Sequence, residues 1–201
     1  MKFKIKGIDF EITFLFVALI TFILTLNAPA NVLITVASSL IHEMGHLLTM
    51  SAVGNKPQCV RFELAGINIK REQSIKISTK NELLIALGGP FANAVIFIIC
   101  CFIICFYQSE FLMTVACINL ILMLFNLLPV KRLDGGMALY FLLSRRFDTE
   151  ICSKILKITS IVFISAIYIW GIYVFVVNGY NFSVIIIAIF LTLSMFGGNE
   201  Y

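Results

Sequence analysis

Long runs of apolar residues alternate with short polar segments along the chain. A helix needs about 20 apolar residues to cross the hydrocarbon core of a bilayer. A short apolar segment at residues 136–144 cannot span and is expected to pack against the other helices. The remaining runs predict six membrane-spanning helices, at residues 12–26, 32–53, 83–107, 111–129, 158–177 and 182–196.

Two polar stretches show a different period, in which apolar and polar side chains alternate. Apolar and charged residues alternate from Val60 to Leu64, and the N-terminal arm has the same pattern. A period of two residues indicates β-strands. We therefore expect two β-hairpins, over residues 1–13 and 58–79, that form a small sheet at the membrane surface. Such a sheet either covers the helix ends or holds an unwound substrate at its edge strand.

The composition indicates that lipid rather than water surrounds most of the chain. Hydrophobic residues make up 60% of the 201 residues, charged residues make up 13%, and the mean hydropathy is +1.01. We predict one integral membrane domain over residues 1–201, all-α and polytopic, with about six transmembrane helices and a small membrane-associated β-sheet on the cytoplasmic side. Besides the two hairpins, its parts are residues 32–53, 83–107 and 111–136 and two C-terminal spans within 155–197.

The basic residues predict the orientation in the membrane. All 15 Lys and Arg residues fall in the N-terminal arm, in residues 54–80 or in residues 131–157. These three segments lie on one side of a six-span chain, and basic residues mark the cytoplasmic side. Both termini are therefore expected in the cytoplasm. The net charge of +4 is that of juxtamembrane flanks and predicts no nucleic-acid partner. The N-terminal segment lacks a signal-peptide cleavage site, so we expect it to be retained.

The second predicted span carries the only two histidines of the chain, in the sequence His42-Glu43-Met44-Gly45-His46. Residues four apart lie on one face of a helix, so both imidazoles can reach one Zn²⁺ ion. Glu43 follows the first histidine and can reach a water molecule as general base. Ionisable residues at membrane depth are costly and usually functional. The motif therefore predicts a catalytic zinc site.

A catalytic zinc site needs a third protein ligand, and four acidic residues are candidates. Asp134 follows the fourth predicted span, between the helix-breaking Pro129 and the pair Gly135-Gly136. Irregular backbone at membrane depth is tolerated where it lines a cavity, which favours Asp134. The alternatives are that Asp134 caps the helix that follows it, or that the ligand is one of Glu63, Glu72 and Glu82.

Three motifs in this order resemble the site-2 protease family of intramembrane zinc metalloproteases, peptidase family M50. They are the H-E-x-x-H motif, the sequence GGPFAN at residues 88–93, and N-x-x-P-x-x-x-L-D-G from Asn126 to Gly135. The predicted plan resembles the six-span sporulation-type branch, which processes a sigma-factor precursor, but without its CBS domain and without a PDZ-type insertion. The resemblance implies that the zinc ligands are His42, His46 and Asp134 and that the catalytic base is Glu43.

Other parts of these motifs have two interpretations each. Asn126 and Asn93 are candidates for stabilising an oxyanion or holding the substrate, and the alternative for Asn93 is a hydrogen bond between helices. Gly88-Gly89-Pro90 either allows close helix packing or lines the active-site cavity.

The predicted function is hydrolysis of peptide bonds in membrane-spanning or membrane-associated substrates, for regulated proteolysis in signalling or sporulation. The cofactor is Zn²⁺, and the partners are a membrane-bound protein substrate and the lipid bilayer, with homo-oligomer formation and regulatory membrane proteins left open. We expect a multi-pass protein of a bacterial cell membrane with a cytoplasmic entrance to its active site. The alternatives are a non-hydrolytic zinc-binding membrane adaptor or transporter, and a different membrane-embedded zinc protease whose site faces water.

Overall fold

The structure is a computed structural model of the whole chain, and it describes residues 2–5, 8–12, 29–55, 59–63, 66–70, 78–177 and 182–196. The predicted first span at residues 12–26 lies outside the described residues, except for Ile12. The chain divides into two compact units, Met1–Leu124 and Phe125–Tyr201.

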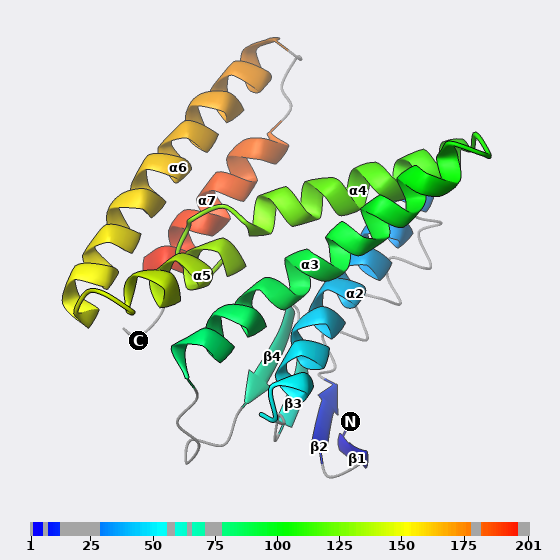
Figure 1. Ribbon diagram of the computed structural model, residues 1–201. Coiled ribbons are helices and arrows are strands. Elements are labelled where there is room, and N and C mark those ends of the chain that lie inside the picture. Colours follow the sequence, from blue (N-terminus) through cyan, green and yellow to red (C-terminus); the bar gives the residue numbers. More distant parts are fainter. Residues whose placement is uncertain are drawn as a thin grey trace. The chain divides into compact units, whose positions relative to one another are not determined.

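Most of the described residues are helical (Figure 1). Within the part of the chain that the structure describes, three helices are long and apolar enough to cross a membrane, namely α2, α3 and α6. The predicted span at residues 111–129 is shorter than expected, because the helix ends at Asn126, ahead of Pro129. Its 17 residues extend about 25 Å at 1.5 Å per residue, which is less than the hydrocarbon thickness of roughly 30 Å. Six spans therefore stay a prediction. The helices are α2 Ala30–Ala52, α3 Thr79–Ile104, α4 Glu110–Asn126, α5 Asp134–Leu143, α6 Thr149–Val177 and α7 Ser183–Phe196.

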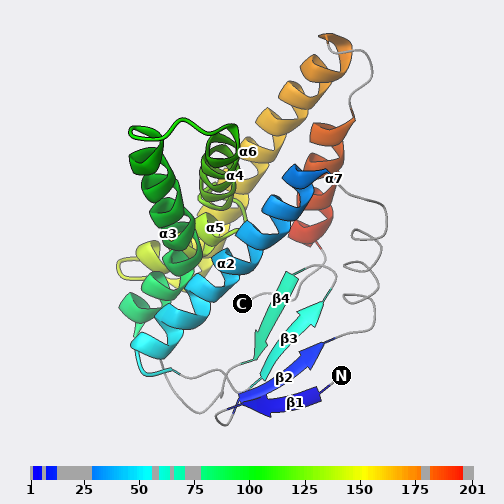
Figure 2. The same ribbon diagram turned by 90° about the vertical axis from the view of Figure 1, so that its right-hand side faces the viewer.

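Four strands form one sheet in the order β1-β2-β3-β4 (Figure 2). The outer pairs are antiparallel, whereas β2 and β3 are parallel, with Phe10 opposite Val60. The sequence pattern predicted the hairpins but not the parallel pairing. The alternating residues at 75–77 lie outside the described residues. The strands are β1 Lys2–Ile5, β2 Ile8–Ile12, β3 Cys59–Glu63 and β4 Gly66–Lys70.

In the first unit, helix α2 packs against α3 (Figure 1), and the close contacts lie between residues 42–49 of α2 and residues 85–93 of α3. The contact depends on two glycines. A Cβ atom at Gly45 would collide with the carbonyl oxygen of Gly88, and a Cβ atom at Gly88 would lie 2.7 Å from the carbonyl oxygen of Gly45. Contacts under 3.0 Å are not tolerated at a Cβ atom, so only glycine permits this approach. Gly88 therefore serves close helix packing.

A buried hydrogen bond ties α4 to α2. The Nδ2 atom of Asn119 donates to Oγ of Ser38 at 3.0 Å, and both side chains are almost completely buried. Ser38 lies one helical turn before His42. The bond therefore holds α4 against the face of α2 that carries the histidines.

In the second unit, helices α6 and α7 pack together around a small apolar core of Val130, Ile164, Leu191 and Met195. The hydroxyl groups of Tyr168 and Thr192 lie 3.3 Å apart and join the same two helices. Helix α6 begins at Thr149, nine residues before the predicted start at residue 158. Its first turns are amphipathic, because Cys152 and Leu156 are buried whereas the neighbouring lysines are exposed. The lysines interrupt the apolar run in the sequence, but the helix continues through them.

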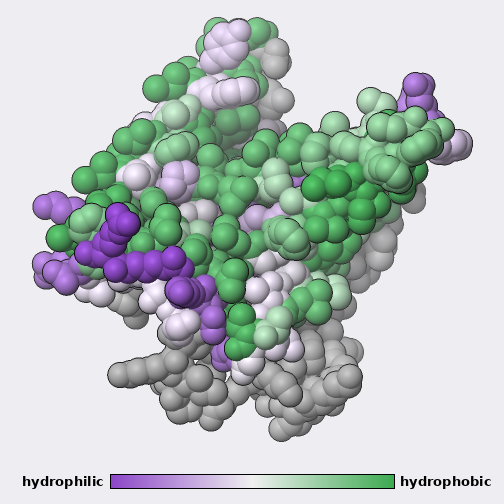
Figure 3. All heavy atoms as spheres, in the orientation of Figure 1, coloured by the Kyte–Doolittle hydropathy of each residue, from purple (hydrophilic) through white to green (hydrophobic). Residues whose placement is uncertain are grey.

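Hydrophobic residues cover most of the helical surface on the face drawn in Figure 3. Large apolar side chains such as Phe102 on α3, Ile121 on α4 and Trp170 on α6 are exposed. Apolar surface of this extent suits contact with lipid rather than with water.

Candidate metal centre

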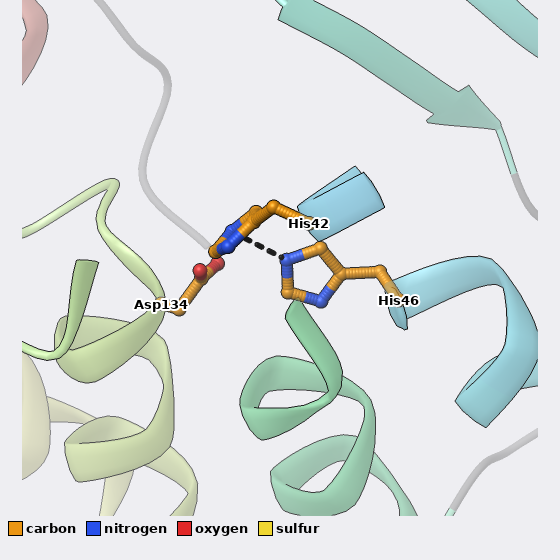
Figure 4. Close-up of side chains that lie close together, drawn as sticks. All are labelled: His42, His46 and Asp134. Carbon is orange, nitrogen blue, oxygen red and sulfur yellow. Dashed lines mark hydrogen bonds between the residues drawn. The ribbon is translucent and has the colours of Figure 1, made fainter. Parts of the chain in front are cut away.

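Helix α2 brings the two histidines of the chain together (Figure 4). His42 and His46 lie four residues apart on its buried face, with 5% and 9% of their surfaces exposed. Their Nε2 atoms are 3.3 Å apart. The spacing in the sequence predicted this convergence, because positions four apart share a helix face.

The outer nitrogen of the His46 ring is fixed by helix α3. Nδ1 of His46 lies 2.7 Å from the carbonyl oxygen of Ile85, to which it donates its proton. The N–H of Gly89 is 3.3 Å from the same nitrogen, but one ring nitrogen cannot donate and accept at once, so the shorter contact sets the tautomer. Pro90 has no N–H and interrupts the hydrogen-bond ladder of α3 nearby. His46 therefore presents the lone pair of Nε2 toward His42.

The outer nitrogen of the His42 ring contacts a different residue of α3. Nδ1 of His42 lies 3.1 Å from Nδ2 of Asn93, whose side chain is completely buried. Asn93 was expected either at the oxyanion or in a hydrogen bond between helices. In the structure it bonds α3 to a histidine of α2.

The backbone of α3 approaches both Nε2 atoms closely at Gly89. A Cβ atom at Gly89 would collide with Nε2 of His42 and with Nε2 of His46. Gly89 thus faces the histidine pair, whereas its neighbour Gly88 faces the backbone of α2. Close helix packing, one interpretation of the GGPFAN motif, is thus met at Gly88, and the lining of an active-site cavity stays a prediction for Gly89. Two converging imidazole nitrogens beside a position without a side chain fit the binding of a metal ion.

Glu43 follows His42 on the same helix and is partly buried. It lies adjacent to the first histidine in the chain, as the H-E-x-x-H motif requires. Glu43 is therefore next to His42 in the chain and about 100° further around the helix.

In the second unit, Asp134 is the first residue of α5. The residue at the N-cap position is Leu133, which makes no side-chain capping bond. Asp134 is therefore not the N-cap that one interpretation of the sequence expected. Asn126 is the last residue of α4 and is partly buried.

The segment before Asp134 is held in an unusual backbone conformation. Arg132 has a φ of 80°, in the left-handed region that residues other than glycine rarely adopt. The N–H of Lys131 donates to Oγ of Ser160 on α6 at 2.8 Å. A Cβ atom at Gly135 would lie 2.7 Å from the carbonyl oxygen of Leu128. These contacts explain why the motif needs glycine after Asp134.

The rival acids differ in position. Glu82 lies in the first turn of α3 and is partly buried. Glu63 is the last residue of strand β3, and Glu72 lies outside the described residues. Sequence reasoning did not find the carbonyl of Ile85 or the hydroxyl of Ser160, because a backbone carbonyl has no sequence signal and a serine in an apolar helix has many roles.

Comparisons with known proteins find similarity to peptidases. Residues 108–169 match the model of peptidase family M50. A zinc metalloprotease of Methanocaldococcus jannaschii is 27% identical over 172 residues, which are 77% of this chain and 50% of the relative. The chain thus spans about half the length of that curated relative.

A solved structure shares the fold. The site-2 protease from Methanocaldococcus jannaschii superimposes with a TM-score of 0.67, at 24% identity, over 97% of this chain and 93% of that chain. The family model and the curated relative thus show similarity to metalloproteases of peptidase family M50, and the solved structure shows a shared fold. The matched residues 108–169 include Asn126 and Asp134.

Proposed function

We propose that this chain is an intramembrane zinc metalloprotease of the site-2 protease type. The observation that carries the proposal is the histidine pair of α2, in which two Nε2 atoms converge beside Gly89 while both Nδ1 atoms contact α3. The printed names of the similar family and relative, and the fold of the similar solved structure, agree with this activity.

The proposed zinc ligands are His42, His46 and Asp134. Each of the three side chains offers one atom that zinc accepts as a ligand, an imidazole nitrogen or a carboxylate oxygen. Two neutral imidazoles and one carboxylate are a common ligand set for catalytic zinc and leave one coordination position open. When bound, zinc supplies a Lewis acid that activates water and polarises a carbonyl group.

The proposed roles of the other residues follow from their chemistry. The carboxylate of Glu43 takes a proton from the attacking water and delivers it to the leaving amine. The amide of Asn126 donates a hydrogen bond to the oxyanion of the scissile carbonyl. Because both residues are polar groups in mainly apolar helices, a catalytic task accounts for their cost in the membrane.

The proposed substrate is a peptide segment within or next to the membrane. A helical peptide bond is shielded by its own hydrogen bonds, so a substrate must unwind before cleavage. The sheet has β1 and β4 at its edges, and an edge strand can bind an extended peptide by strand addition. The resemblance to the sporulation-type branch further supports regulated proteolysis in signalling or sporulation, with termini and entrance on the cytoplasmic side of a bacterial membrane.

The test compares the wild-type protein with Glu43→Gln and with the exposed control Glu150→Gln. Each is co-expressed with candidate single-span membrane substrates, and the purified protein is analysed for zinc. Glu43→Gln should keep zinc and yield no cleavage product, whereas Glu150→Gln should cleave like the wild type. A wild-type protein that binds zinc and cleaves none of the substrates, even when purified substrates are added, would favour the adaptor or transporter. Loss of zinc in Glu43→Gln would contradict the role of this residue as a base.

A further inference from the structure

The contact between Asn93 and His42 is incompatible with a metal ion on His42 in its present orientation. Nδ2 of Asn93 lies 3.1 Å from Nδ1 of His42, and an amide nitrogen can only donate. Nδ1 then accepts, so the proton of the neutral ring is on Nε2. This proton fits between the two Nε2 atoms, which are 3.3 Å apart. His42 in this tautomer has no Nε2 lone pair to offer to a metal ion.

The oxygen atom of the same amide could accept a proton from His42, which would free Nε2 of His42 for a metal ion. Oδ1 of Asn93 is buried and has no hydrogen-bond partner among the residues that the structure describes. If the amide turns by half a rotation, Oδ1 takes the place of Nδ2 and accepts a proton from Nδ1 of His42. The proton of the ring is then on Nδ1, and Nε2 presents its lone pair toward Nε2 of His46. Two lone pairs at this distance repel each other unless a cation lies between them.

We propose that Asn93 is a positioning residue that selects the tautomer of His42, donating to Nδ1 in the metal-free protein and accepting from Nδ1 when zinc is bound. An amide is the side chain that serves both states, because it carries a donor and an acceptor at equivalent positions. The inference rests on the metal centre proposed above and assigns to Asn93 a role toward the metal ligand, in place of the oxyanion.

The position of Asn93 suits this role. Its side chain is completely buried on α3, a rigid helix that also supplies the carbonyl of Ile85 to His46. Metal-binding histidines generally hold their second nitrogen in a hydrogen bond, and such outer partners fix the tautomer and the ring direction. Helix α3 therefore holds both rings. The carbonyl oxygen of Ile85 always accepts from His46, whereas the amide of Asn93 can either donate to His42 or accept from it.

The first measurement is the zinc affinity of purified variants, by competition with a chelator of known affinity. Asn93→Leu keeps the approximate volume and removes both hydrogen-bonding groups, and it should weaken zinc binding roughly 10- to 100-fold. Asn93→Asp keeps only the accepting function and should bind zinc within about threefold of the wild type, since a carboxylate is a common outer partner of zinc histidines. The matched control is Asn119→Leu, because Asn119 is also fully buried and bonded to α2, at Ser38. It should bind zinc like the wild type.

The second measurement does not depend on any variant. The chain has two histidines, so labelling histidine with ¹⁵N gives four ring-nitrogen signals. Addition of zinc should convert one of the two rings from the Nε2–H to the Nδ1–H tautomer and leave the other ring as Nδ1–H throughout. Rings that are both Nδ1–H without zinc, or a zinc affinity of Asn93→Leu equal to that of the wild type, would overturn the inference. A wild-type protein that binds no zinc would instead overturn the proposed function.

Discussion

The backbone N–H of Lys131 donates a hydrogen bond to the hydroxyl oxygen of Ser160 at 2.8 Å, and the same hydroxyl donates to the carbonyl oxygen of Leu156 at 2.6 Å. Ser160 is completely buried on α6. Both hydrogen-bonding functions of the hydroxyl are therefore used, and one of them joins α6 to the segment that leads into Asp134. The buried side chain of Val130 packs into the core of α6 and α7 beside this bond. Helix α6 thus supports the backbone conformation from which Asp134 emerges.

Replacing Ser160 by alanine should destabilise the protein. The change removes the part-buried hydrogen bond that the N–H of Lys131 donates to Ser160, and the loss of such a bond costs about 0.5–1.5 kcal/mol. The free energy of unfolding in detergent, measured for the metal-free protein, gives the effect directly. The matched control is Ser153→Ala on the same helix, where the exposed hydroxyl bonds only to the carbonyl of Glu150. That change should stay within about 0.5 kcal/mol, and equal effects of both changes would argue against the role of Ser160.

Replacing Gly89 by alanine should remove metal binding while the helices remain. The added methyl group would collide with Nε2 of both histidines, so the two rings cannot point at a common ion. Alanine favours a helix over glycine by roughly 0.5–1 kcal/mol, so circular dichroism should show helix content at or above that of the wild type. Zinc content after purification should fall to a small fraction of the wild-type value.

The neighbouring glycine supplies the comparison for that experiment. A Cβ atom at Gly88 would lie 2.7 Å from the carbonyl oxygen of Gly45 and 2.5 Å from Oγ1 of Thr49. Gly88→Ala should therefore separate α2 from α3 and lower the free energy of unfolding, which Gly89→Ala should not do. Full zinc occupancy in Gly89→Ala would mean that the histidines do not meet a metal ion beside α3.

The sequence predicted those features that depend on residues near in the chain. The spacing of His42 and His46 gave their shared face, and Pro129 gave the break that separates α4 from α5. It could not predict the partners of the imidazoles, because the carbonyl of Ile85 and the bare face of Gly89 depend on how α3 packs on α2.

Other features depended on competing effects that a pattern cannot weigh. The lysines near the start of α6 interrupt the apolar run in the sequence, so the pattern predicted a helix that begins at residue 158. In the structure the helix begins at Thr149, and its first turns bury Cys152 and Leu156. For Asn93 the sequence allowed two roles, stabilisation of an oxyanion and a hydrogen bond between helices, and it did not distinguish them. Only the contact with His42 relates this residue to the histidine pair.

Reporter fusions should locate the cytoplasmic side by the distribution of basic residues. Fusions within residues 27–31, at Gln108 and within residues 178–181 should report an external position, because these segments contain no Lys or Arg. Fusions at Lys70 and Asp148 lie in basic segments and should report the cytoplasm. A cytoplasmic signal at Gln108 would contradict six spans and would require a different path through the membrane.

Replacing Asp134 by asparagine should abolish tight zinc binding with little effect on the fold. Asparagine keeps the shape of the side chain and loses its charge, which a zinc ligand needs. Asp134 and Glu82 both lie in the first turn of a helix, where an anion stabilises the helix by about 0.3–1 kcal/mol. Asp134→Asn and Glu82→Gln should therefore cost the metal-free protein a similar, small free energy of unfolding, whereas only Asp134→Asn should lose zinc and cleavage. Titration of both variants with zinc and a competing chelator separates the two effects. If Glu82→Gln loses zinc and Asp134→Asn keeps it, the third ligand is on α3 and the proposed ligand set is wrong.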